Sequence, residues 1–559
     1  MDRLQAIREL TAEGKAYELV PAQAWGRSIR VFRAAPPQLR DLYEAARSDL
    51  PFLVYGEERS SFEEVWQESC KLAHYLVNDC GIVPGDRVAI SMRNYPEWVT
   101  TFMAATSVGA IAVAMNALWQ PEEMAYGLRD SGSKVLFCDE ERLARLGKQS
   151  EKFDELRIVC VRAASALDWA TVRLEDVLMS GSLDQMPETA MQPNDPATIF
   201  YTSGSTGAPK GVVSSHRNIV NALMSWELDA HVAAHLAGRT ISPPDRQAAT
   251  LLGVPLFHVT GSHAVFLSSY RSQRRMVGMH KWDVEEAAAL IERERISTLV
   301  APAAMTGDLV ATAMTTGHDL SSLDLVGGGG APRAPEQVRG IDKAFKRAKP
   351  NTGWGMTETN AIGTGIAGRD YLEHPESSGR VSALLDLRIV LDSGAEASPE
   401  ERGELQVRGA SVFRGYWNRD DANAETFDGE WMRTGDVAYL DPDGYLVIVD
   451  RIKDLVIRGG ENIGCGGVES ALLEHPDVVE ASVYGVPDAR LGEEVGATIY
   501  ATGGLTEDEI RDFLSSRLSR FAIPRYLRFV AAPLPRTASG KILKRQLREL
   551  ALADLALSN

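Results

Sequence analysis

The chain has 559 residues, of which 77 are acidic and 59 are basic, so its formal net charge is −18. This length exceeds what one hydrophobic core usually organises, and we therefore expect two or more structural units. The acidic surplus argues against nucleic acid as a partner, because a polyanion would be repelled. The five cysteines are too scattered for a zinc or disulfide framework, which indicates a reducing, cytoplasmic location.

From about residue 61, helix patterns alternate with short apolar strand patterns. The expected helices are 62–78, 96–108, 216–226 and 283–294, and the expected strands are 87–91, 110–114, 134–137, 250–254 and 297–301. Such alternation is typical of parallel, doubly wound α/β units. The uncharged run 100–119 is long enough to span a membrane. Because it is rich in Ala, Gly, Ser and Thr, we instead expect a buried helix followed by a buried strand, and no transmembrane segment.

Beyond residue 380 the pattern changes to short strands separated by turns, which predicts an antiparallel, barrel-like subdomain. The expected strands are 386–391, 403–407 and 445–449. A charged segment follows the last of them, as suits an exposed hinge. We therefore predict an α/β protein with a large N-terminal domain of doubly wound units plus a β-barrel-like subdomain and a small mobile C-terminal α/β domain. The predicted boundaries are 1–449 for the large domain, 450–453 for the hinge and 454–559 for the small domain; residues 1–45 carry no recognisable chemistry.

Residues 201–211 read Tyr-Thr-Ser-Gly-Ser-Thr-Gly-Ala-Pro-Lys-Gly and follow an apolar, strand-like run. Gly204 and Gly207 allow backbone N–H groups to turn toward one point, the hydroxyl side chains add donors, and Lys210 adds a compact positive charge. These properties suit a polyphosphate, although the spacing is not that of a Walker P-loop. The alternative is a flexible surface loop, because linkers have the same composition.

Two later stretches add groups that suit a nucleotide. Residues 324–332 are a strand that runs into four glycines, against which a flat ligand could lie, although a tight turn would give the same pattern. In residues 353–359, Trp354 is flanked by glycines and can offer its ring face to a purine. Thr357 can bind a phosphate, and Glu358 is a hard oxygen ligand suited to magnesium.

Single residues complete the set of candidates. Asp436 follows a glycine and can accept hydrogen bonds from ribose hydroxyls. Lys541 follows Gly540 in a basic segment, which suits a mobile loop that presents one ammonium group, although such runs are usually solvated. His258 follows a strand, where a lone histidine is more often a structural hydrogen-bonding residue than a base.

Taken in order, these stretches resemble the signature motifs of the adenylate-forming (ANL) superfamily, in particular its AMP-forming acyl-CoA synthetases and fatty-acid or aryl-acid CoA ligases. The resemblance covers about residues 50–550. It implies that ATP and AMP are bound by Thr202, Ser203, Gly204, Ser205, Thr206, Gly207, Lys210, Gly329, Ala331, Pro332, Trp354, Gly355, Met356, Thr357, Asp436 and Arg451. It further implies catalytic residues Lys541, Thr357 and Glu358 with Glu358 as the Mg²⁺ ligand, an acyl pocket at His258, Gly328, Gly330 and Gly353, and hinge and CoA-facing residues Asp450, Gly459, Gly460 and Glu461.

The reaction implied by this resemblance has two steps. A carboxylate attacks ATP to give acyl-AMP and pyrophosphate, and CoA then takes the acyl group and releases AMP. The expected acid is a medium- or long-chain fatty, aromatic or polycyclic acid, because the glycines at 327–330 and 353 suggest a roomy pocket. The partners are thus ATP with Mg²⁺, CoA and a small carboxylic acid, and a homodimer is left open. Alternatives are an adenylating enzyme that delivers acyl-AMP to a carrier protein or other acceptor, and a non-catalytic nucleotide-binding protein.

The chain departs from the family pattern at a few positions. Trp354 stands where the family usually has Tyr or Phe, so it keeps a stacking role but loses any hydroxyl contact. Gly328 stands where serine is often found. Gly464-Cys465-Gly466-Gly467 stands where relatives generally carry an aromatic–proline pair and a glutamate, which leaves the acceptor side of the site in question.

Overall fold

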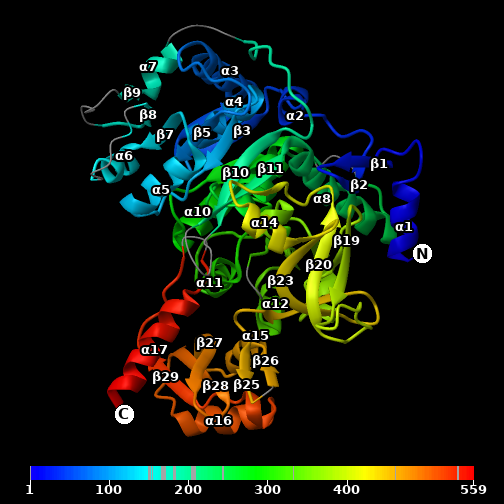
Figure 1. Ribbon diagram of the computed structural model, residues 1–559, viewed down its shortest axis with the longest axis vertical. Coiled ribbons are helices and arrows are strands. Elements are labelled where there is room, and N and C mark those ends of the chain that lie inside the picture. Colours follow the sequence, from blue (N-terminus) through cyan, green and yellow to red (C-terminus); the bar gives the residue numbers. More distant parts are fainter. Residues whose placement is uncertain are drawn as a thin grey trace.

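The computed structural model describes residues 2–148, 153, 155–164, 171–179, 184–202, 209–241, 245–330, 333–459, 461–537 and 540–558. Figure 1 shows a large upper part of sheets and surrounding helices, and a small lower part, in orange and red, that contains the C-terminus. This α/β arrangement, with a large N-terminal domain and a small C-terminal domain, confirms the predicted fold class.

Two extended sheets form the core of the large domain. The first has the order β21 (Gly415–Tyr416), β11 (Lys210–Ser215), β10 (Pro196–Thr202), β6 (Ile111–Ala114), β5 (Arg87–Ser91), β7 (Val135–Asp139), β8 (Arg157–Val161) and β9 (Thr171–Arg173). The second has the order β18 (Arg380–Val381), β17 (Thr364–Ala367), β16 (Lys349–Thr352), β15 (Leu325–Gly327), β14 (Thr298–Val300), β12 (Ala249–Leu252), β13 (Arg275–Gly278), β3 (Pro51–Tyr55) and β4 (Glu58–Ser61). The central strands of both sheets run parallel, as the alternating helix and strand patterns predict.

Helices connect these strands, and α3 (Phe62–Asn78) illustrates why they begin where they do. The Ser61 hydroxyl accepts a hydrogen bond from the Glu64 N–H, and the Glu64 carboxylate accepts one from the Ser61 N–H at 2.7 Å. This capping box satisfies two N–H groups that the helix itself leaves unpaired. The other helices of the large domain are α1 (Arg3–Leu10), α2 (Leu39–Ala45), α4 (Pro96–Ser107), α5 (Pro121–Ser131), α6 (Glu140–Leu146), α7 (Leu174–Met179), α8 (His216–Leu236), η1 (Thr260–Leu267), α9 (Ser268–Arg271), α10 (Val284–Glu294), α11 (Ala303–Ala313), α12 (Pro335–Ala344), η2 (Thr357–Thr359), α13 (Gly368–Glu373) and α14 (Asp420–Thr426).

The uncharged run at 100–119 has the structure predicted for it. It forms the second half of α4, which is buried from Trp98 to Ser107, and then the fully buried strand β6. Within the described residues, we find no helix that is both long and apolar enough to cross a membrane. Helix α8, in contrast, extends to Leu236, well beyond its predicted end at Trp226, because Leu228 and Val232 continue its buried stripe.

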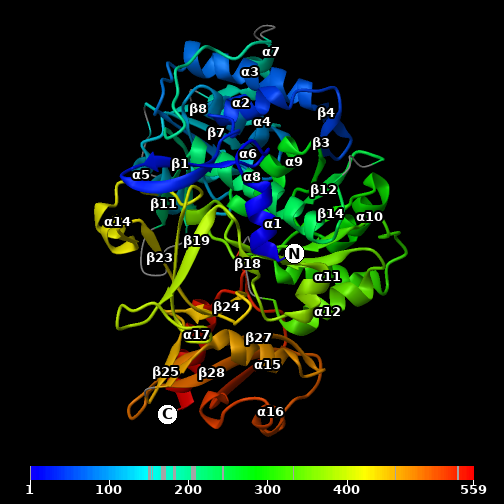
Figure 2. The same cartoon turned by 90° about the vertical axis from the view of Figure 1, so that its right-hand side faces the viewer.

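An antiparallel sheet forms the predicted barrel-like subdomain. Its strands are β19 (Leu385–Val390), β20 (Gly403–Gly409), β23 (Trp431–Leu440) and β22 (Phe427–Asp428), with β24 (Leu446–Arg451) paired to β23. The small domain has its own sheet, β26 (Glu461–Ile463), β25 (Val456–Arg458), β28 (Gly492–Ala501), β27 (Val478–Asp488) and β29 (Tyr526–Val530), and its own helices α15 (Cys465–Leu473), α16 (Glu507–Ser515), η3 (Arg520–Ala522) and α17 (Lys544–Ser558). Figure 2 shows β24 at the junction between the two parts.

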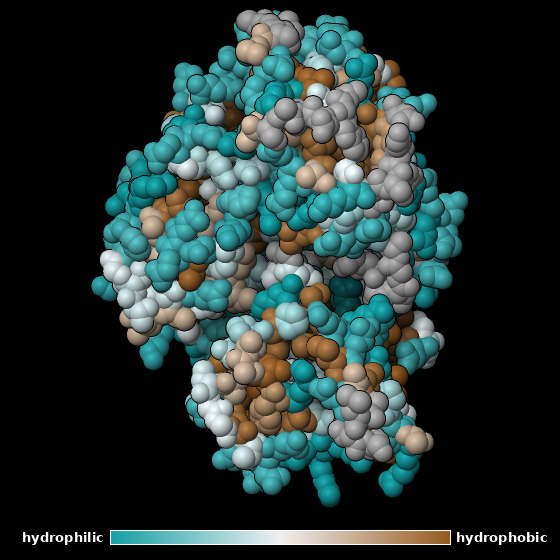
Figure 3. All heavy atoms as spheres, turned by 90° about the vertical axis from the view of Figure 1, so that its left-hand side faces the viewer, coloured by the Kyte–Doolittle hydropathy of each residue, from teal (hydrophilic) through white to brown (hydrophobic). Residues whose placement is uncertain are grey.

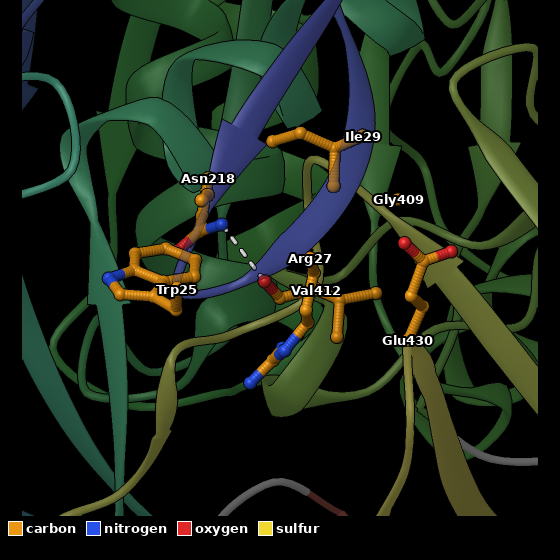
Figure 4. Close-up of a pocket in the computed structure, with 8 residues that line it drawn as sticks. Trp25, Arg27, Ile29, Asn218, Gly409, Val412 and Glu430 are labelled. Carbon is orange, nitrogen blue, oxygen red and sulfur yellow. Dashed lines mark hydrogen bonds between the residues drawn. The ribbon is translucent and has the colours of Figure 1, made fainter.

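The N-terminal residues form a hairpin, β1 (Leu19–Ala24) and β2 (Arg27–Phe32), that ties the barrel to the rest of the large domain. Arg27 donates hydrogen bonds to the Phe413 and Arg414 carbonyls, and its guanidinium lies 3.7 Å from the centre of the Phe427 ring. Figure 4 shows the small hollow at this seam, where Asn218 of α8 donates to the Val412 carbonyl. The hairpin thus has a structural role that the sequence did not reveal.

Candidate active site

The structure brings together the two ends of the predicted phosphate loop. Strand β10 ends at Thr202 and its antiparallel neighbour β11 begins at Lys210, and these two residues are partners in the register. The Thr202 hydroxyl donates to the Lys210 carbonyl. The predicted ligands Ser203, Gly204, Ser205, Thr206, Gly207, Ala331, Pro332 and Gly460 lie outside the described residues.

Glu358 is a buried carboxylate beside this loop. It lies on the short helix η2, is 7% exposed, and accepts a hydrogen bond from the Tyr416 hydroxyl at 2.8 Å. The Lys210 ammonium lies 5.0 Å from the centre of the same tyrosine ring, so Tyr416 connects the loop to the carboxylate. Burial raises the pKa of Glu358, while the Tyr416 bond opposes that rise. Thr357, next to it, is half-buried.

Asp436 is the second buried carboxylate, and its two oxygens have different partners. Trp354 donates its indole N–H to Oδ2 at 2.7 Å, and Arg451 forms an ion pair with Oδ1 at 2.7 Å. Asp436 and Arg451 are register partners on β23 and β24. Burial raises the pKa of Asp436, whereas Arg451 and Trp354 act to lower it. The sequence predicted a stacking role for Trp354, and the structure adds a hydrogen bond from its ring nitrogen.

The Trp354 ring packs closely against Gly363. A Cβ placed on Gly363 would lie 2.4 Å from a ring carbon of Trp354, so a side chain at position 363 would displace the indole. The neighbouring motif residues Gly355 and Met356 hold the turn, since a Cβ on Gly355 would lie 2.5 Å from the Ala361 carbonyl oxygen and Met356 packs into the barrel core.

Lys541 reaches this group from the small domain. In Figure 1 the red segment before α17 rises to the large domain beside α11. A Cβ on Gly540 would lie 3.3 Å from a ring carbon of Pro302, so the loop touches the large domain just before α11. The Lys541 side chain is exposed to solvent. Its pKa is nevertheless lowered, first by burial and then by the charge of Arg451. The charges of Asp436 and Glu358 act to raise it. The charges of Arg451, Asp436 and Glu358 thus act on the Lys541 ammonium across the domain junction.

The loop that carries Lys541 is held at both ends. The Thr537 N–H donates to the Lys541 carbonyl at 2.7 Å, and the Lys541 N–H donates to the Thr537 hydroxyl. Arg536 donates to the Gly540 carbonyl and pairs with Glu480 at 2.8 Å. The described residues on the two sides of this segment, Thr537 and Lys541, are therefore held together.

The glycines that suggested a roomy acyl pocket are mostly packed against backbone. A Cβ on Gly328 would lie 2.5 Å from the Ala301 carbonyl oxygen, and one on Gly353 would lie 2.3 Å from the Thr364 carbonyl oxygen. Gly329 would likewise meet the Gly353 carbonyl oxygen at 2.9 Å, whereas Gly330 faces open space. These contacts correct the argument from glycine content to pocket size, because close approach of neighbouring strands accounts for most of the glycines.

His258 lies on the same side of the site as Lys541. It is half-buried next to Phe257, and burial followed by the Lys541 charge lowers its pKa to about 4. The ring is thus neutral at physiological pH, in keeping with a wall residue rather than a cation.

The remaining candidates belong to the hinge and the small domain. Asp450 accepts hydrogen bonds from the N–H groups of Arg451 and Cys465. Gly459 donates its N–H to the Leu491 carbonyl, and Glu461 is exposed at the start of β26. Asp450 lies on β24 opposite Val437 of β23, next to the pair formed by Asp436 and Arg451, whereas the described contacts of Gly459 and Glu461 are with small-domain residues.

Tyr416 is the residue of this site that sequence reasoning missed. It belongs to a two-residue edge strand with no recognisable motif around it, and 57 residues separate it from Glu358 in the chain. Only the pairing of β21 with β11, which places Tyr416 opposite Val212, brings it to the phosphate loop.

Figure 3 shows a furrow between the large domain and the small domain on one face of the molecule. The side chains described above come from both sides of this junction: Lys210, Trp354, Glu358, Asp436 and Arg451 from the large domain and Lys541 from the small one. Such a group of cations, buried carboxylates and an aromatic ring can bind a nucleotide and neutralise its phosphates.

Comparison with known proteins agrees with this geometry. Residues 42–417 match the family model of the AMP-binding enzymes, and residues 467–541 match the model of the AMP-binding enzyme C-terminal domain. The 2-succinylbenzoate–CoA ligase of Bacillus velezensis is 31% identical over 505 residues, which cover 90% of this chain and 96% of that protein. A long-chain-fatty-acid–CoA ligase of Mycobacterium tuberculosis is 33% identical over 471 residues, covering 84% and 89%.

Solved structures give the same relationship. The o-succinylbenzoate CoA synthetase of Bacillus subtilis in complex with its acyl-adenylate intermediate has a TM-score of 0.77 at 28% identity and covers 92% of this chain and 98% of its own. A structure of that enzyme with ATP and a magnesium ion has a TM-score of 0.77 at 27% identity, covering 92% and 100%. The chain therefore belongs to the AMP-binding enzymes of the adenylate-forming superfamily, as one of its acyl-CoA synthetases.

Proposed function

We propose that this protein activates a carboxylic acid at the α-phosphate of ATP, within the group around Lys541, and passes the acyl group to CoA. One observation carries the proposal: the small-domain segment with Lys541 packs against Pro302 of the large domain, where the ammonium interacts electrostatically with two buried carboxylates, Asp436 and Glu358. The CoA-ligase names of the relatives support the same reaction.

The first step needs positioning and charge neutralisation more than proton transfer. Attack of a carboxylate oxygen on the α-phosphorus forms the acyl phosphate bond and breaks the bond to pyrophosphate, so the product carries AMP as a leaving group. Negative charge gathers on the phosphoryl oxygens, and a preorganised cation stabilises it. Lys541 supplies that cation at the α-phosphate and Lys210 supplies one at the loop. In this proposal Asp436 and Arg451 hold the ribose, and the Trp354 ring stacks on the adenine.

ATP enters as its magnesium complex. In the part of the chain that the structure describes, no group of three or more His, Cys, Asp and Glu side chains could hold a metal alone. A single carboxylate beside a phosphate loop fits Mg²⁺ better, because this ion is usually held by one or two carboxylates and by the substrate phosphates. Glu358 is that carboxylate, and the Tyr416 hydroxyl fixes its orientation. Thr357 adds a hydroxyl to the same phosphates.

The second step requires the small domain to move. Strand β24 ends at Arg451 and β25 begins at Val456, so only a short connection joins the two domains. We assign the large domain to residues 1–449, the pivot to 450–453 and the moving domain to 454–559. Rotation there withdraws Lys541 and turns the face with Gly459, Gly460 and Glu461 toward the thiol. The departure at 464–467 touches this face, which keeps a carrier protein as the alternative acceptor.

The acid is proposed from the relatives and not from pocket size. Their names give 2-succinylbenzoate and long-chain fatty acids as the acids they use. We therefore propose a bulky acid, namely a medium- or long-chain fatty, aromatic or polycyclic one, bordered by His258, Gly328, Gly330 and Gly353.

The free state of the five cysteines, including the buried neighbours Cys138 and Cys160, supports a reducing, cytoplasmic location. A homodimer stays a prediction, and light scattering tests it.

The pH dependence of adenylation follows from three groups. Burial raises the pKa values of Glu358 and Asp436, so the rate is expected to increase as pH rises through these elevated values and the carboxylates become charged. Burial and Arg451 lower the pKa of Lys541, so the rate is expected to fall as the ammonium loses its proton below the usual range for lysine. The profile of kcat/KM for pyrophosphate release is thus bell-shaped. In Lys541→Arg the alkaline limb should move to higher pH, because guanidinium stays charged; an unmoved limb contradicts the assignment.

The reaction itself is tested with a panel of carboxylic acids. Purified protein is incubated with Mg²⁺, ATP and each acid, with and without CoA, and pyrophosphate, AMP and thioester are measured. We expect CoA-dependent thioester formation and AMP release with at least one bulky acid. Pyrophosphate release without thioester would favour a carrier protein or another acceptor, and no pyrophosphate with any acid would overturn the proposal.

A further inference from the structure

The start of helix α15 is pressed against the last strand of the large domain. A Cβ on Gly464 would lie 2.8 Å from Cγ1 of Val449 and 3.0 Å from its carbonyl oxygen, and one on Gly466 would lie 3.5 Å from the same oxygen. An aromatic side chain at position 464 would not fit here unless the two elements moved apart. The glycines of this segment therefore permit a closer contact between the domains than the usual family sequence allows.

A hydrogen bond crosses the predicted pivot at the same place. The Cys465 N–H donates to Oδ2 of Asp450 at 2.6 Å, while the other oxygen of Asp450 accepts from the Arg451 N–H. Cys465 is the first residue of α15, whose N–H has no partner within the helix. Asp450 thus caps the helix with a charged group, which also interacts favourably with the helix dipole. Asp450 is the first residue of the proposed pivot and still belongs to strand β24 of the large domain, whereas Cys465 belongs to the moving domain, so rotation about the residues that follow Asp450 would separate donor and acceptor.

The same helix is connected to the segment that carries Lys541. Glu469, one turn along α15, accepts a hydrogen bond from the Val483 N–H and forms an ion pair with Lys544 at 3.1 Å. Burial opposes the Lys544 charge, but Glu469, Cys465 and Asp450 together raise its pKa. Lys544 begins α17, three residues after Lys541. The capped helix and the catalytic loop therefore move as one body.

We propose that the Asp450–Cys465 bond is a latch that holds the small domain where Lys541 faces the ATP site, and so slows the transfer to CoA relative to acyl-adenylate formation. This inference rests on the proposed function, in which the domain must leave this position before the thiol reacts. The latch needs a main-chain N–H at position 465, and proline, which related chains carry there, has none. A charge-assisted hydrogen bond of this kind shifts a two-state equilibrium by about 10- to 100-fold.

A pair of substitutions at one residue tests the latch. Cys465→Pro removes the N–H at a helix position that tolerates proline, whereas Cys465→Ala keeps the N–H and removes only the thiol, which contacts the Asp454 carbonyl. Two half-reactions are measured for each variant: pyrophosphate release from ATP and acid, and CoA-dependent consumption of preformed acyl-AMP. We expect the CoA step of Cys465→Pro to be about tenfold faster than in the wild type or Cys465→Ala, with adenylation unchanged or slower. Equal CoA-step rates in the two variants would overturn the latch.

A second variant and a second measurement make the test independent of folding and of the reaction. Gly464→Ala places a Cβ against Val449 without removing any hydrogen bond, and it should also make the CoA step faster. It replaces Cys465→Pro in the test if that variant does not fold. Spin labels at Met314→Cys and Val479→Cys, two exposed positions on the large and small domains, report the domain arrangement without any substrate. The latch predicts one dominant distance in wild type and a second population in Cys465→Pro and Gly464→Ala. An unchanged distance distribution in both variants refutes the latch even if no acid is ever found, whereas a protein without ligase activity refutes only the proposed function.

Discussion

Replacing Lys541 with alanine is expected to slow acyl-adenylate formation by about 100- to 1,000-fold, the usual effect of removing one preorganised charge from a transition state. Lys541 is the small-domain cation whose charge interacts with Asp436, Glu358 and Arg451 of the large domain. The substitution removes it from a loop whose turn is held by Thr537 and Arg536, so the fold should be unaffected. Single-turnover release of pyrophosphate measures the step.

The second half-reaction is the matched control for this variant. In the proposed mechanism Lys541 has left the site before CoA reacts, so Lys541→Ala should consume preformed acyl-AMP and CoA at a rate within about threefold of wild type. Full-speed pyrophosphate release by the variant would remove Lys541 from the mechanism. Equal loss in both steps would point to a structural defect instead, and circular dichroism and thermal unfolding would reveal it.

Asp436→Asn is expected to raise the KM for ATP and the Kd for AMP by about 10- to 100-fold, since a charged acceptor is lost from a buried site. The two oxygens of Asp436 face two donors, Trp354 Nε1 and Arg451 Nε, each at 2.7 Å. An asparagine offers one acceptor and one donor, so one of these N–H groups must face another N–H group. After losing its partner, the guanidinium of the half-exposed Arg451 can hydrogen-bond to water, whereas the indole N–H of Trp354 cannot. The substitution should therefore shift the Trp354 ring and weaken the proposed ribose contact.

Calorimetry of AMP binding measures this effect without catalysis. Trp354→Phe serves as the comparison, because it keeps the carboxylate and an aromatic face and removes only the indole donor. We expect a loss of about 2- to 10-fold for Trp354→Phe, the range of a single neutral donor. The assignment of Asp436 to the ribose fails if Asp436→Asn binds AMP as tightly as wild type while remaining folded.

Local patterns predicted the elements that local forces determine. The helix at 62–78 was placed at its observed ends, because the Ser61–Glu64 capping box and the following buried stripe are both local. The end of α8 was missed because Leu228 and Val232 are buried by tertiary packing that composition does not reveal. Likewise, the charged segment at 450–454 predicts an exposed turn but not that Asp450 caps a helix beginning at Cys465.

The same contrast between features set by neighbouring residues and features set by tertiary packing applies to the candidate site. Motifs predict site roles for Lys210, Glu358, Asp436 and Lys541, since each lies in a short stretch with characteristic neighbours, and these roles stay predictions. Tyr416 could not be identified, because its role depends on the pairing of an edge strand and not on its sequence surroundings. The glycines at 328 and 353 were assigned to pocket volume, whereas they serve strand contacts that only the fold reveals.

The N-terminal hairpin bears on the relative positions of the groups that are proposed to bind the two ends of the nucleotide. It contacts the barrel-like subdomain through Arg27, Ser28 and Arg30, which bond to Phe413, Glu430 and Asp386, and on its other side the Phe32 N–H donates to Asn221 of α8, the helix that follows the strand of Lys210. The hairpin therefore adds to the contacts, such as the pairing of β11 with β21, that hold Asp436 and Lys210 in their relative positions. Substitutions that weaken the hairpin contacts should therefore lower the affinity for nucleotide, while both sheets keep their own hydrogen bonds. The affinity should fall before the stability to unfolding does.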